Sequence, residues 1–542
     1  MLTIQEKKLK RILEIIPGLI AWTVLICPFV FGIWVPRGVA YFMIIFDFYW
    51  LVKAFRMAGY LLSSHFHMKR DNNIDWFERC KKLEDLDEYI VEKTSEVLRS
   101  SVFSKKKNRE DLQELLDLHA MPDSYKKSWK DIYHVVMLPN YKDEYKILHS
   151  GIKSLLDANF PTDKTIVVIG LEAREQGNDK FERAEKAIKE FRNNLYDIFY
   201  TVHPDDIIGE LKGKSANTKW MGEKLREYVD KNKIAHDDVI VSVFDGDTRV
   251  SKEYVGCLVY KYLVNTKRIK RSYQPIPLFS NNIWETPFIT RTVALGSSFW
   301  QMIESCRPYR LINFSSQASS LQTLVEEGFQ DATIVSEDSR QFYRIFFLYH
   351  GDHRAIPMFT PVYMDAVVGN SFWQTLKFQY LQKRRWAWGM ENFPYLVIES
   401  LKHKEIPWWP KIVLIFRLIK GTVEWSTASL LIAFAGWMPL LLNTGFRDSV
   451  LAVNLPIMAR NLLTLTWLGI FITAFVGFTL LPKRPARYSK WKYLEMILQW
   501  AITPITGIIF GSIPAIDAQT RWMLGGRFKL GFWVTPKKFE ER

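Results

Sequence analysis

The residues Val239-Ile-Val-Ser-Val-Phe-Asp-Gly-Asp247 join a short apolar run to two carboxylates, and this stretch decides the fold. The run Val239–Phe244 is rich in β-branched residues, which is typical of a buried strand. Asp245 and Asp247 follow it directly, on either side of a glycine. Two carboxylates at a strand end can hold Mg²⁺ or Mn²⁺ against a substrate phosphate. Alone, the tripeptide is also a common turn.

Upstream of this stretch, strand-like runs alternate with amphipathic segments of helical length. Alternation of this kind predicts an α/β fold, with a parallel-rich mixed sheet and helices on both faces. Ligands of such sheets lie beyond the carboxyl ends of the strands, where Asp245 and Asp247 fall. The expected strands are Tyr133–Leu138, Thr165–Leu171 and Asp197–Val202, and the expected helices are Glu144–Leu156, Lys180–Asn194 and Ser215–Lys231.

Apolar segments flank this region on both sides. Glu14–Trp34 and Gly38–Phe55 precede it and are expected to cross a bilayer core of ~30 Å. Trp408–Lys420 carries basic residues at helical spacing, which suits a helix in the membrane interface. Further spans are expected at Trp425–Leu442 and Leu462–Leu481. The chain is therefore expected to be a multi-pass protein of the plasma membrane.

The excess of basic over acidic residues in the chain agrees with a membrane location. Its 542 residues carry a formal net charge of +15, and much of the excess lies beside the apolar segments, as in cytoplasmic loops of membrane proteins. No Lys/Arg stripe interleaved with aromatics is present, so nucleic acid is not an expected partner. Four scattered cysteines indicate neither a disulfide framework nor a structural zinc site, which fits a cytoplasmic middle region.

Two later motifs add to the chemistry. Ser336-Glu337-Asp338 follows a β-like run, and a carboxylate there could take a proton from an attacking hydroxyl, although a helix N-cap is an equal reading. Gln382-Lys-Arg-Arg385-Trp386 offers a guanidinium for phosphate and an indole face for a sugar ring. The alternative for this second motif is a basic-aromatic stretch beside a membrane.

In this order and at these separations, the three motifs resemble those of the processive family-two glycosyltransferases. This group contains the cellulose, chitin and hyaluronan synthases, whose pattern is Asp-x-Asp, Thr/Ser-Glu-Asp and Gln-x-x-Arg-Trp on a catalytic domain of the GT-A type. The resemblance runs over about residues 131–538, roughly three quarters of the chain. It implies a metal-dependent enzyme that uses a UDP- or GDP-sugar donor and a glycan acceptor.

The same resemblance implies roles for single residues. Asp245 and Asp247 would hold the metal, and Asp338, beside Glu337, would be the catalytic base. Gln382, Arg385 and Trp386 would place the acceptor sugar. Residues assigned to the donor, from segments similar to Pro-x-Tyr-Asn-Glu, a Lys/Asn segment and the Phe-x-Val-Thr-x-Lys gating loop, are Tyr141, Glu144, Glu172, Lys214, Asn217, Asp245, Thr535 and Lys537.

The chain also departs from the family pattern. The usual Asp pair after the second strand is replaced by a segment in which Glu172 could do a similar job, and Lys142 replaces an Asn. The base of the nucleotide is therefore left open. A full third span after Trp386 would leave the gating loop outside the cell, so Tyr493–Ile516 is expected to be a hairpin bent near Pro504 that returns to the cytoplasm.

The expected organisation follows from these segments. It comprises two transmembrane helices (1–60), a charged helical membrane-proximal segment (61–130), the catalytic domain (131–405), an interfacial helix with transmembrane helices and the hairpin (406–516), and an interfacial helix with the gating loop (517–542).

The expected function is inverting sugar transfer to a growing polysaccharide, with help in its translocation. The alternatives are single addition to a lipid or short glycan, and a non-enzymatic nucleotide-sugar-binding membrane protein. A homo-oligomer and a channel partner are both left open.

Overall fold

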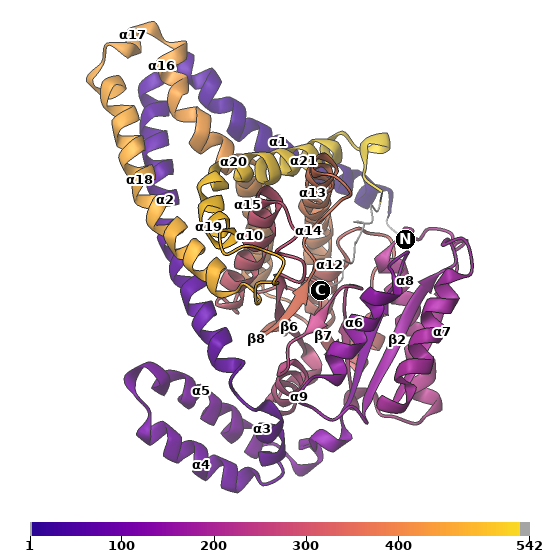
Figure 1. Ribbon diagram of the computed structural model, residues 1–542. Helices are drawn as coiled ribbons and strands as arrows, with labels where there is room; N and C mark the ends of the chain where they lie inside the picture. Colours follow the sequence, from indigo (N-terminus) through magenta and orange to yellow (C-terminus); the bar gives the residue numbers. More distant parts are fainter. Residues whose placement is uncertain (1–2, 532–542) are drawn as a thin grey trace.

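The four strand-like runs predicted from the sequence are parallel neighbours in one sheet. In the computed structural model, which describes residues 3–531, β1 (Tyr133–Pro139) pairs with β2 (Thr165–Glu172) and with β4 (Val239–Val243). β3 (Asp197–His203) pairs with β2 on the outer side. All four strands therefore end at the same edge of the sheet (Figure 1).

Four later strands extend the sheet beyond β4. The order is β3-β2-β1-β4-β7-β6-β8-β5, with β7 antiparallel to β4 and β6, β6 parallel to β8, and β5 antiparallel to β8. The predicted mixed, parallel-rich sheet is thus confirmed. These strands are β5 (Arg249–Val250), β6 (Arg271–Phe279), β7 (Ala318–Ser320) and β8 (Arg354–Met364).

Helices cover both faces of the sheet, as the pattern predicted. Successive residues of a strand point to opposite faces. Val136 and Leu138 belong to one buried cluster with α6, α7 and α9, whereas Val135 and Met137 belong to another with α8 and α11. These helices are α6 (Tyr145–Leu156), α7 (Asp179–Phe191), α8 (Lys214–Lys231), α9 (Tyr254–Val264) and α11 (Leu321–Glu327).

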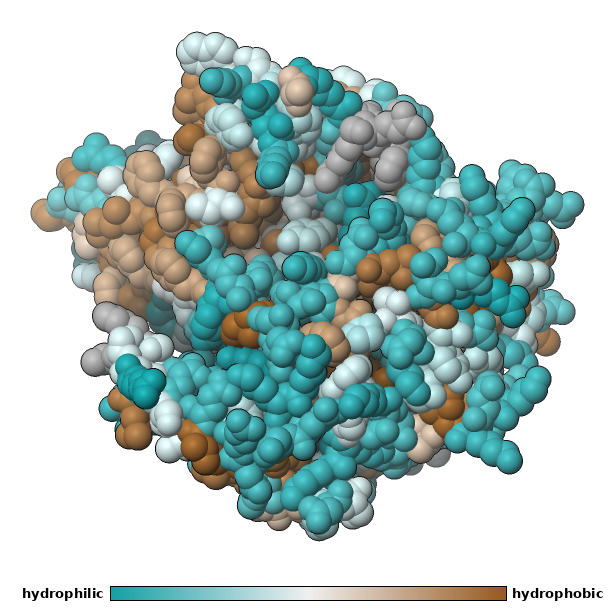
Figure 2. Space-filling view, turned by 60° about the horizontal axis from the view of Figure 1, so that its bottom comes forward, coloured by the Kyte–Doolittle hydropathy of each residue, from teal (hydrophilic) through white to brown (hydrophobic). Residues whose placement is uncertain are grey.

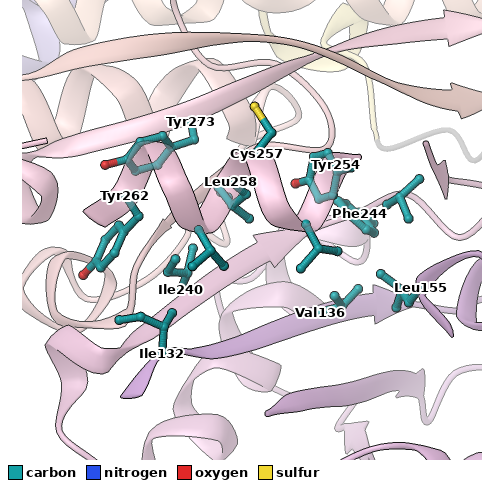
Figure 3. Packing of buried hydrophobic residues seen from close by; sticks show 14 of the residues in the cluster. Ile132, Val136, Leu155, Ile240, Phe244, Tyr254, Cys257, Leu258, Tyr262 and Tyr273 are labelled. Atoms are coloured by element: carbon teal, nitrogen blue, oxygen red, sulfur yellow. The ribbon is translucent and has the colours of Figure 1, made fainter. Parts of the chain in front are cut away.

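The larger cluster is unusually rich in aromatic hydroxyls. Figure 3 shows Tyr262 of α9 between Ile240 of β4 and Tyr273 of β6, and Tyr254 of the same helix beside Phe244. The Tyr254 hydroxyl bonds Ser242 at 3.1 Å, and the Tyr262 hydroxyl donates to the Asp237 carbonyl at 2.8 Å. These bonds satisfy the hydroxyls of Tyr254 and Tyr262, whereas the buried Tyr273 hydroxyl has no hydrogen-bond partner among the described residues.

Within residues 3–531, five helical segments are long and apolar enough to cross a membrane. They lie together on one side of the molecule, away from α6–α8 (Figure 1), and Figure 2 shows apolar surface gathered there beside a largely hydrophilic remainder. Their bounds are Ile4–Trp34 (α1), Pro36–Asp71 (α2), Trp408–Leu442 (α15, Trp408–Phe434, and α16, Met438–Leu442), Val450–Thr479 (α18) and Lys492–Leu524.

The charged segment that follows α2 packs against the domain that contains the sheet. α2 has 36 residues and is therefore ~54 Å long, well beyond a bilayer core of ~30 Å. It carries α3 (Trp76–Lys82) onto α9, where the Cys80 thiol donates to the Gly256 carbonyl at 3.5 Å. α4 (Leu86–Arg99) and α5 (Val102–His119) follow at the same end of the domain, beside the C-terminal part of α2, where Lys107 and Glu110 of α5 interact electrostatically with His67 (Figure 1).

The expected interfacial helix is continuous with the span that follows it. α15 runs unbroken from Trp408 to Phe434, because Gly421 alone does not end a helix. Two of its basic residues bind backbone carbonyls of the domain that contains the sheet. Lys411 donates to the carbonyls of Ser400 and His403 at 2.9 Å each, and Arg417 donates to Tyr309 O at 2.6 Å.

The segment Tyr493–Ile516, for which a hairpin is expected, is one continuous, bent helical segment, and its expected return to the cytoplasmic side stays a prediction. Every residue from Lys492 to Leu524 is in a helical turn, through α19 (Lys492–Leu498), α20 (Thr503–Gly507) and α21 (Ile513–Leu524) with short 3₁₀ and π turns between them. Proline at the first turn of α20 and of α21 is compatible with a helix, so the chain bends without reversing.

Two glycines in helices give a matched test of the packing. A Cβ at Gly222 of α8 would lie 2.3 Å from the Phe329 ring, whereas one at Gly296 of α10 (Phe288–Ser305) meets nothing within 4 Å. Alanine favours a helix by about 1 kcal/mol over glycine, but overpacking a core costs about 1–3 kcal/mol. We therefore expect Gly222→Ala to lower the midpoint of thermal unfolding in detergent and Gly296→Ala to keep or raise it. Equal midpoints would contradict this packing.

Candidate active site

The Asp-Gly-Asp turn lies at the end of β4, and neighbouring segments hold both carboxylates. Asp245 accepts hydrogen bonds from Lys214 Nζ and from Ser315 Oγ, each at 2.6 Å. Asp247 is buried, and its Oδ2 accepts the backbone N–H of Asp365 at 2.9 Å. The turn is therefore built into the edge of the sheet, between α8 and the end of β8.

The glycine between the two carboxylates lies close to the end of β1. A Cβ at Gly246 would lie 2.9 Å from Asp143 Oδ2 and 3.4 Å from the Pro139 carbonyl. The turn thus passes closely over the end of β1 and over the segment that contains Tyr141. This contact joins the predicted metal motif to the predicted donor motif.

The residues present fit a divalent cation. Asp245 and Asp247 supply hard oxygen donors, the chemistry that Mg²⁺ and Mn²⁺ prefer. The Lys214 ammonium lies 2.6 Å from Asp245 Oδ1, so a cationic group already contacts this oxygen. Two carboxylates leave most of the coordination to phosphate oxygens and water, as is usual for Mg²⁺ sites. Asp245 and Asp247 would hold such an ion.

Lys214 also joins this turn to the Ser-Glu-Asp motif. Its ammonium lies 3.6 Å from Glu337 Oε1. Burial opposes its charge, but the carboxylates of Asp245, Asp338 and Glu337 together raise the pKa of Lys214 above its ordinary value. Lys214 is therefore charged at neutral pH and partly neutralises this acidic group.

Asp338 is in a position to hold a proton near neutrality. Burial raises the pKa of its carboxyl well above the ordinary aspartate value. The positive charges of Lys214 and Arg385 lower this pKa, while Glu337 and Asp245 raise it further. A carboxylate of raised basicity is what a general base for a hydroxyl requires.

Two residues that belong to no recognised sequence motif, Glu391 and Asn392, hold the loop before Asp338. Glu391 accepts the backbone N–H groups of Val335 at 3.0 Å and Ser336 at 2.7 Å, and the Ser336 hydroxyl at 2.6 Å. Asn392 donates to Ser339 Oγ at 2.9 Å. Ser336 precedes α12 (Glu337–Leu348) but makes no side-chain cap bond, so its hydroxyl serves this contact instead.

The third motif lies on α13 (Phe372–Ala387). Arg385 faces Glu337 and Asp338 closely enough to lower the pKa of both carboxyls. The centres of the Trp386 ring and the Phe279 ring, at the end of β6, are 5.7 Å apart. The side-chain amide of Gln379 donates a hydrogen bond to Gln382 Oε1 at 3.1 Å. Arg385 therefore belongs to the same charged group as Lys214, and Trp386 is held against the sheet.

α21 packs against the other side of α13. Asp517 accepts hydrogen bonds from Tyr380 and Arg384, each at 3.0 Å, and from Arg521 at 2.6 Å. The indole of Trp522 meets that of Trp388 edge-on at 5.1 Å. The C-terminal helix and the Gln-x-x-Arg-Trp helix thus form one packed unit.

Beyond β2, a small pocket opens beside Tyr141. The Arg174 guanidinium lies 4.1 Å from the centre of the Tyr141 ring and forms an ion pair with Glu172. Arg174 was not among the residues predicted from the sequence, because it belongs to no recognised motif. The pocket is lined by Glu172, Arg174, His203, Pro204, Asp205, Ile207, Glu210, Leu211 and Lys212.

The other residues that were predicted to bind the sugar donor lie in different environments. Asn217 is buried and donates to the Gly170 carbonyl at 2.9 Å, which ties α8 to β2. Glu144 is exposed at the N-terminus of α6. Thr535 and Lys537 lie outside the described residues.

Comparisons with known proteins find only distant similarity. No protein-family model and no curated protein matches the chain. Similar solved structures include the mannosyltransferase PcManGT from Pyrobaculum calidifontis in complex with GDP-Man and Mn²⁺, at 14% identity and a TM-score of 0.34, covering 78% of this chain and 98% of that one. TarS 1–349 of S. aureus matches at 12% identity and a TM-score of 0.32, covering 73% and 92%. At these values the likeness carries no functional argument.

The fit of the Asp-Gly-Asp turn to a cation can be tested by binding. We expect Asp247→Asn to weaken Mn²⁺ binding by about tenfold or more, since even lost outer-shell partners cost metal sites 10–100-fold. Calorimetric titration with Mn²⁺ in the presence of UDP, and separately of GDP, measures this. Asp230→Asn, which removes an exposed carboxylate of α8, is the matched control. Unchanged Mn²⁺ affinity in Asp247→Asn would remove this turn from metal binding.

Proposed function

We propose that the chain is a membrane-embedded glycosyltransferase of the GT-A type. It transfers a hexosyl group from a UDP- or GDP-sugar to a growing polysaccharide, on the cytoplasmic side of the plasma membrane. The observation that supports this most is the convergence of three distant motifs on Lys214. Its ammonium contacts Asp245 at 2.6 Å and Glu337 at 3.6 Å, and Arg385 of the third motif faces Glu337 and Asp338.

The donor occupies the carboxyl ends of β1, β2 and β4. Tyr141 and Glu172, with Arg174 between them, hold the nucleoside, and Lys214 moves its charge from Asp245 to the diphosphate. A divalent cation on Asp245 and Asp247, when bound, offsets the charge that develops on the departing diphosphate. Thr535 and Lys537 are proposed to close over the nucleotide and exclude water.

The reaction is a single displacement with inversion. An acceptor hydroxyl attacks the anomeric carbon as the bond from that carbon to the diphosphate oxygen breaks. Asp338 takes the hydroxyl proton, and its raised pKa suits this step. Gln382, Arg385 and Trp386 position the acceptor sugar. The packing of α21 behind α13 places these residues between the sheet and the membrane helices.

Four of the five apolar segments are proposed to cross the membrane. The segment Lys492–Leu524 contacts the catalytic domain at both ends, through the Glu495 pair with Arg291 and through Asp517 with Arg384. Arg11, at the start of α1, donates to the Met523 carbonyl at 2.5 Å. A helix whose two ends touch the same domain begins and ends on one side of the bilayer. The C-terminus is then on the side of the nucleotide site.

The reaction itself is tested by product analysis. Purified protein is incubated with each member of a panel of UDP- and GDP-sugars and Mn²⁺, and products are sized by mass spectrometry. We expect long glycans from one donor, and a loss of transfer of about 10²-fold or more in Asp338→Asn, because a general base contributes 10²–10⁴-fold.

Asp352→Asn is the control, since this carboxylate pairs with Arg271 on the surface of the same domain. Normal transfer by Asp338→Asn would refute its role as base. Single-sugar products would replace the processive function with single addition, and donor binding without transfer would favour a binding protein.

The proposed topology predicts where the C-terminus lies. Green fluorescent protein fused after Arg542 is expected to fluoresce, because it folds in the cytoplasm, and alkaline phosphatase fused there is expected to be inactive. Fusions after Asn443, in the turn between α16 and α17 (Thr444–Arg447), are expected to give the opposite result. An active phosphatase at the C-terminus would mean that all five segments cross.

A further inference from the structure

Five basic side chains meet where α2 and α15 leave the apolar part of the bundle. Lys53 comes from α2, and Arg417 and Lys420 come from α15. Arg307 and Arg310 come from the segment that follows α10. We call these five residues the interfacial basic cluster. None of them has a role in the proposed sugar transfer.

The cluster carries more positive charge than its carboxylates balance. Glu304 pairs with Arg307 and, at 3.3 Å, with Arg310. Glu424 pairs with Lys53 at 2.8 Å and with Lys420 at 3.7 Å. Two carboxylates thus serve four of the cations, and these seven side chains keep a net charge of +3.

Like charges in the cluster face one another. Arg310 is close enough to Lys53 and to Arg417 to interact electrostatically with both. Arg417 donates to the Tyr309 carbonyl at 2.6 Å, a neutral acceptor that does not offset its charge. Like charges held together near a low-dielectric boundary repel unless an anion lies between them. This arrangement therefore calls for an anionic ligand.

The position of the cluster along α2 and α15 indicates which kind of anion it binds. On α2, Lys53 lies at the end of the apolar segment that begins after Pro36, and on α15 the apolar segment begins after Glu424. Both helices thus place the cluster at one boundary of the apolar zone. Tyr49 and Phe416 flank it with 39% and 59% of their surfaces exposed, as expected of lipid-facing side chains.

The charged ends of the cluster are within reach of this boundary. The side chains of Arg310 and Lys420 are 37% and 44% exposed. Guanidinium groups bind phosphate oxygens through paired hydrogen bonds, and each basic residue near an anionic membrane surface contributes about 1 kcal/mol. An ordinary solvated basic loop would spread such residues along the chain, whereas these come from three separate elements.

We propose that the interfacial basic cluster binds the phosphate headgroup of an anionic phospholipid, from the leaflet that faces the catalytic domain. The acyl chains lie along the exposed apolar surface of α2 and α15. The headgroup phosphate lies among Arg310, Arg417 and Lys420 and relieves their mutual repulsion. This site is separate from the donor site and does not depend on the identity of the sugar.

Native mass spectrometry of the full chain in neutral detergent tests this proposal. The probes are phosphatidylglycerol and phosphatidylcholine with the same acyl chains, at equal concentration. We expect the unaltered protein to retain phosphatidylglycerol at several-fold higher occupancy. Arg310→Gln/Arg417→Gln should lose most of this preference. Lys483→Gln/Lys490→Gln makes the same change of charge at exposed positions of another loop and should keep it.

Two further arms keep the result interpretable. Lys420→Gln alters one exposed side chain and should reduce the preference even if the double variant is unstable. Inorganic phosphate at millimolar concentration should not displace phosphatidylglycerol. Equal retention of both lipids, or equal loss of preference in the control variant, would overturn the proposal. Displacement by inorganic phosphate would assign the cluster to a free anion.

Discussion

The ion pair between Lys214 and the carboxylates around it is the interaction on which the candidate site depends. Asp245, Glu337 and Asp338 come from distant parts of the chain and would repel one another in a partly buried site. The Lys214 ammonium offsets this repulsion, and Arg385 adds a second positive charge from α13. Lys214 occupies the first turn of α8, so the seating of that helix on β1 and β2 determines where the charge lies.

The parallel arrangement of β1 to β4 brings together the chain segments that carry the charged residues of this interaction. Parallel strands end at one edge, so the segments after β1, β2 and β4 meet there regardless of their separation along the chain. Gly246 allows the closest of these approaches, between the Asp-Gly-Asp turn and the end of β1. The antiparallel β7 and the parallel pair β6 and β8 then close the other side, where Ser315 and Asp365 contact the two aspartates.

Much of the fold, and a smaller part of the site, could be predicted from the sequence. The run Val239–Phe244 and its upstream counterparts have the β-branched composition of buried strands, and their observed bounds agree within one or two residues. Glu391, Ser315 and Arg174 were missed because they act through contacts between distant segments, which leave no local pattern. The segment Tyr493–Ile516 is one bent helical segment and not a pair of antiparallel helices, because each proline expected to break it occupies the first turn of a helix. Asn217, assigned to the donor by resemblance, bonds a β2 carbonyl instead.

The apolar helices and the domain that contains the sheet are connected by several packed contacts. α21 contacts α13 through Asp517 and the segment after α13 through Trp522, and it contacts α1 through Arg11, so the Gln-x-x-Arg-Trp helix, the first apolar helix and α21 pack together. The position of α13, which carries Trp386, therefore depends on the positions of these helices. α15 provides a second continuous connection, because one helix extends from the domain into the apolar zone.

The most direct measurement of this account is an electron cryo-microscopy structure of the chain with Mn²⁺ and a nucleoside diphosphate, prepared with UDP and with GDP. The account predicts Mn²⁺ on Asp245 and Asp247, the base between Tyr141 and Glu172, and the Lys214 ammonium on the diphosphate instead of on Asp245. A nucleotide bound elsewhere, or Lys214 still paired with Asp245 beside a bound nucleotide, would contradict it.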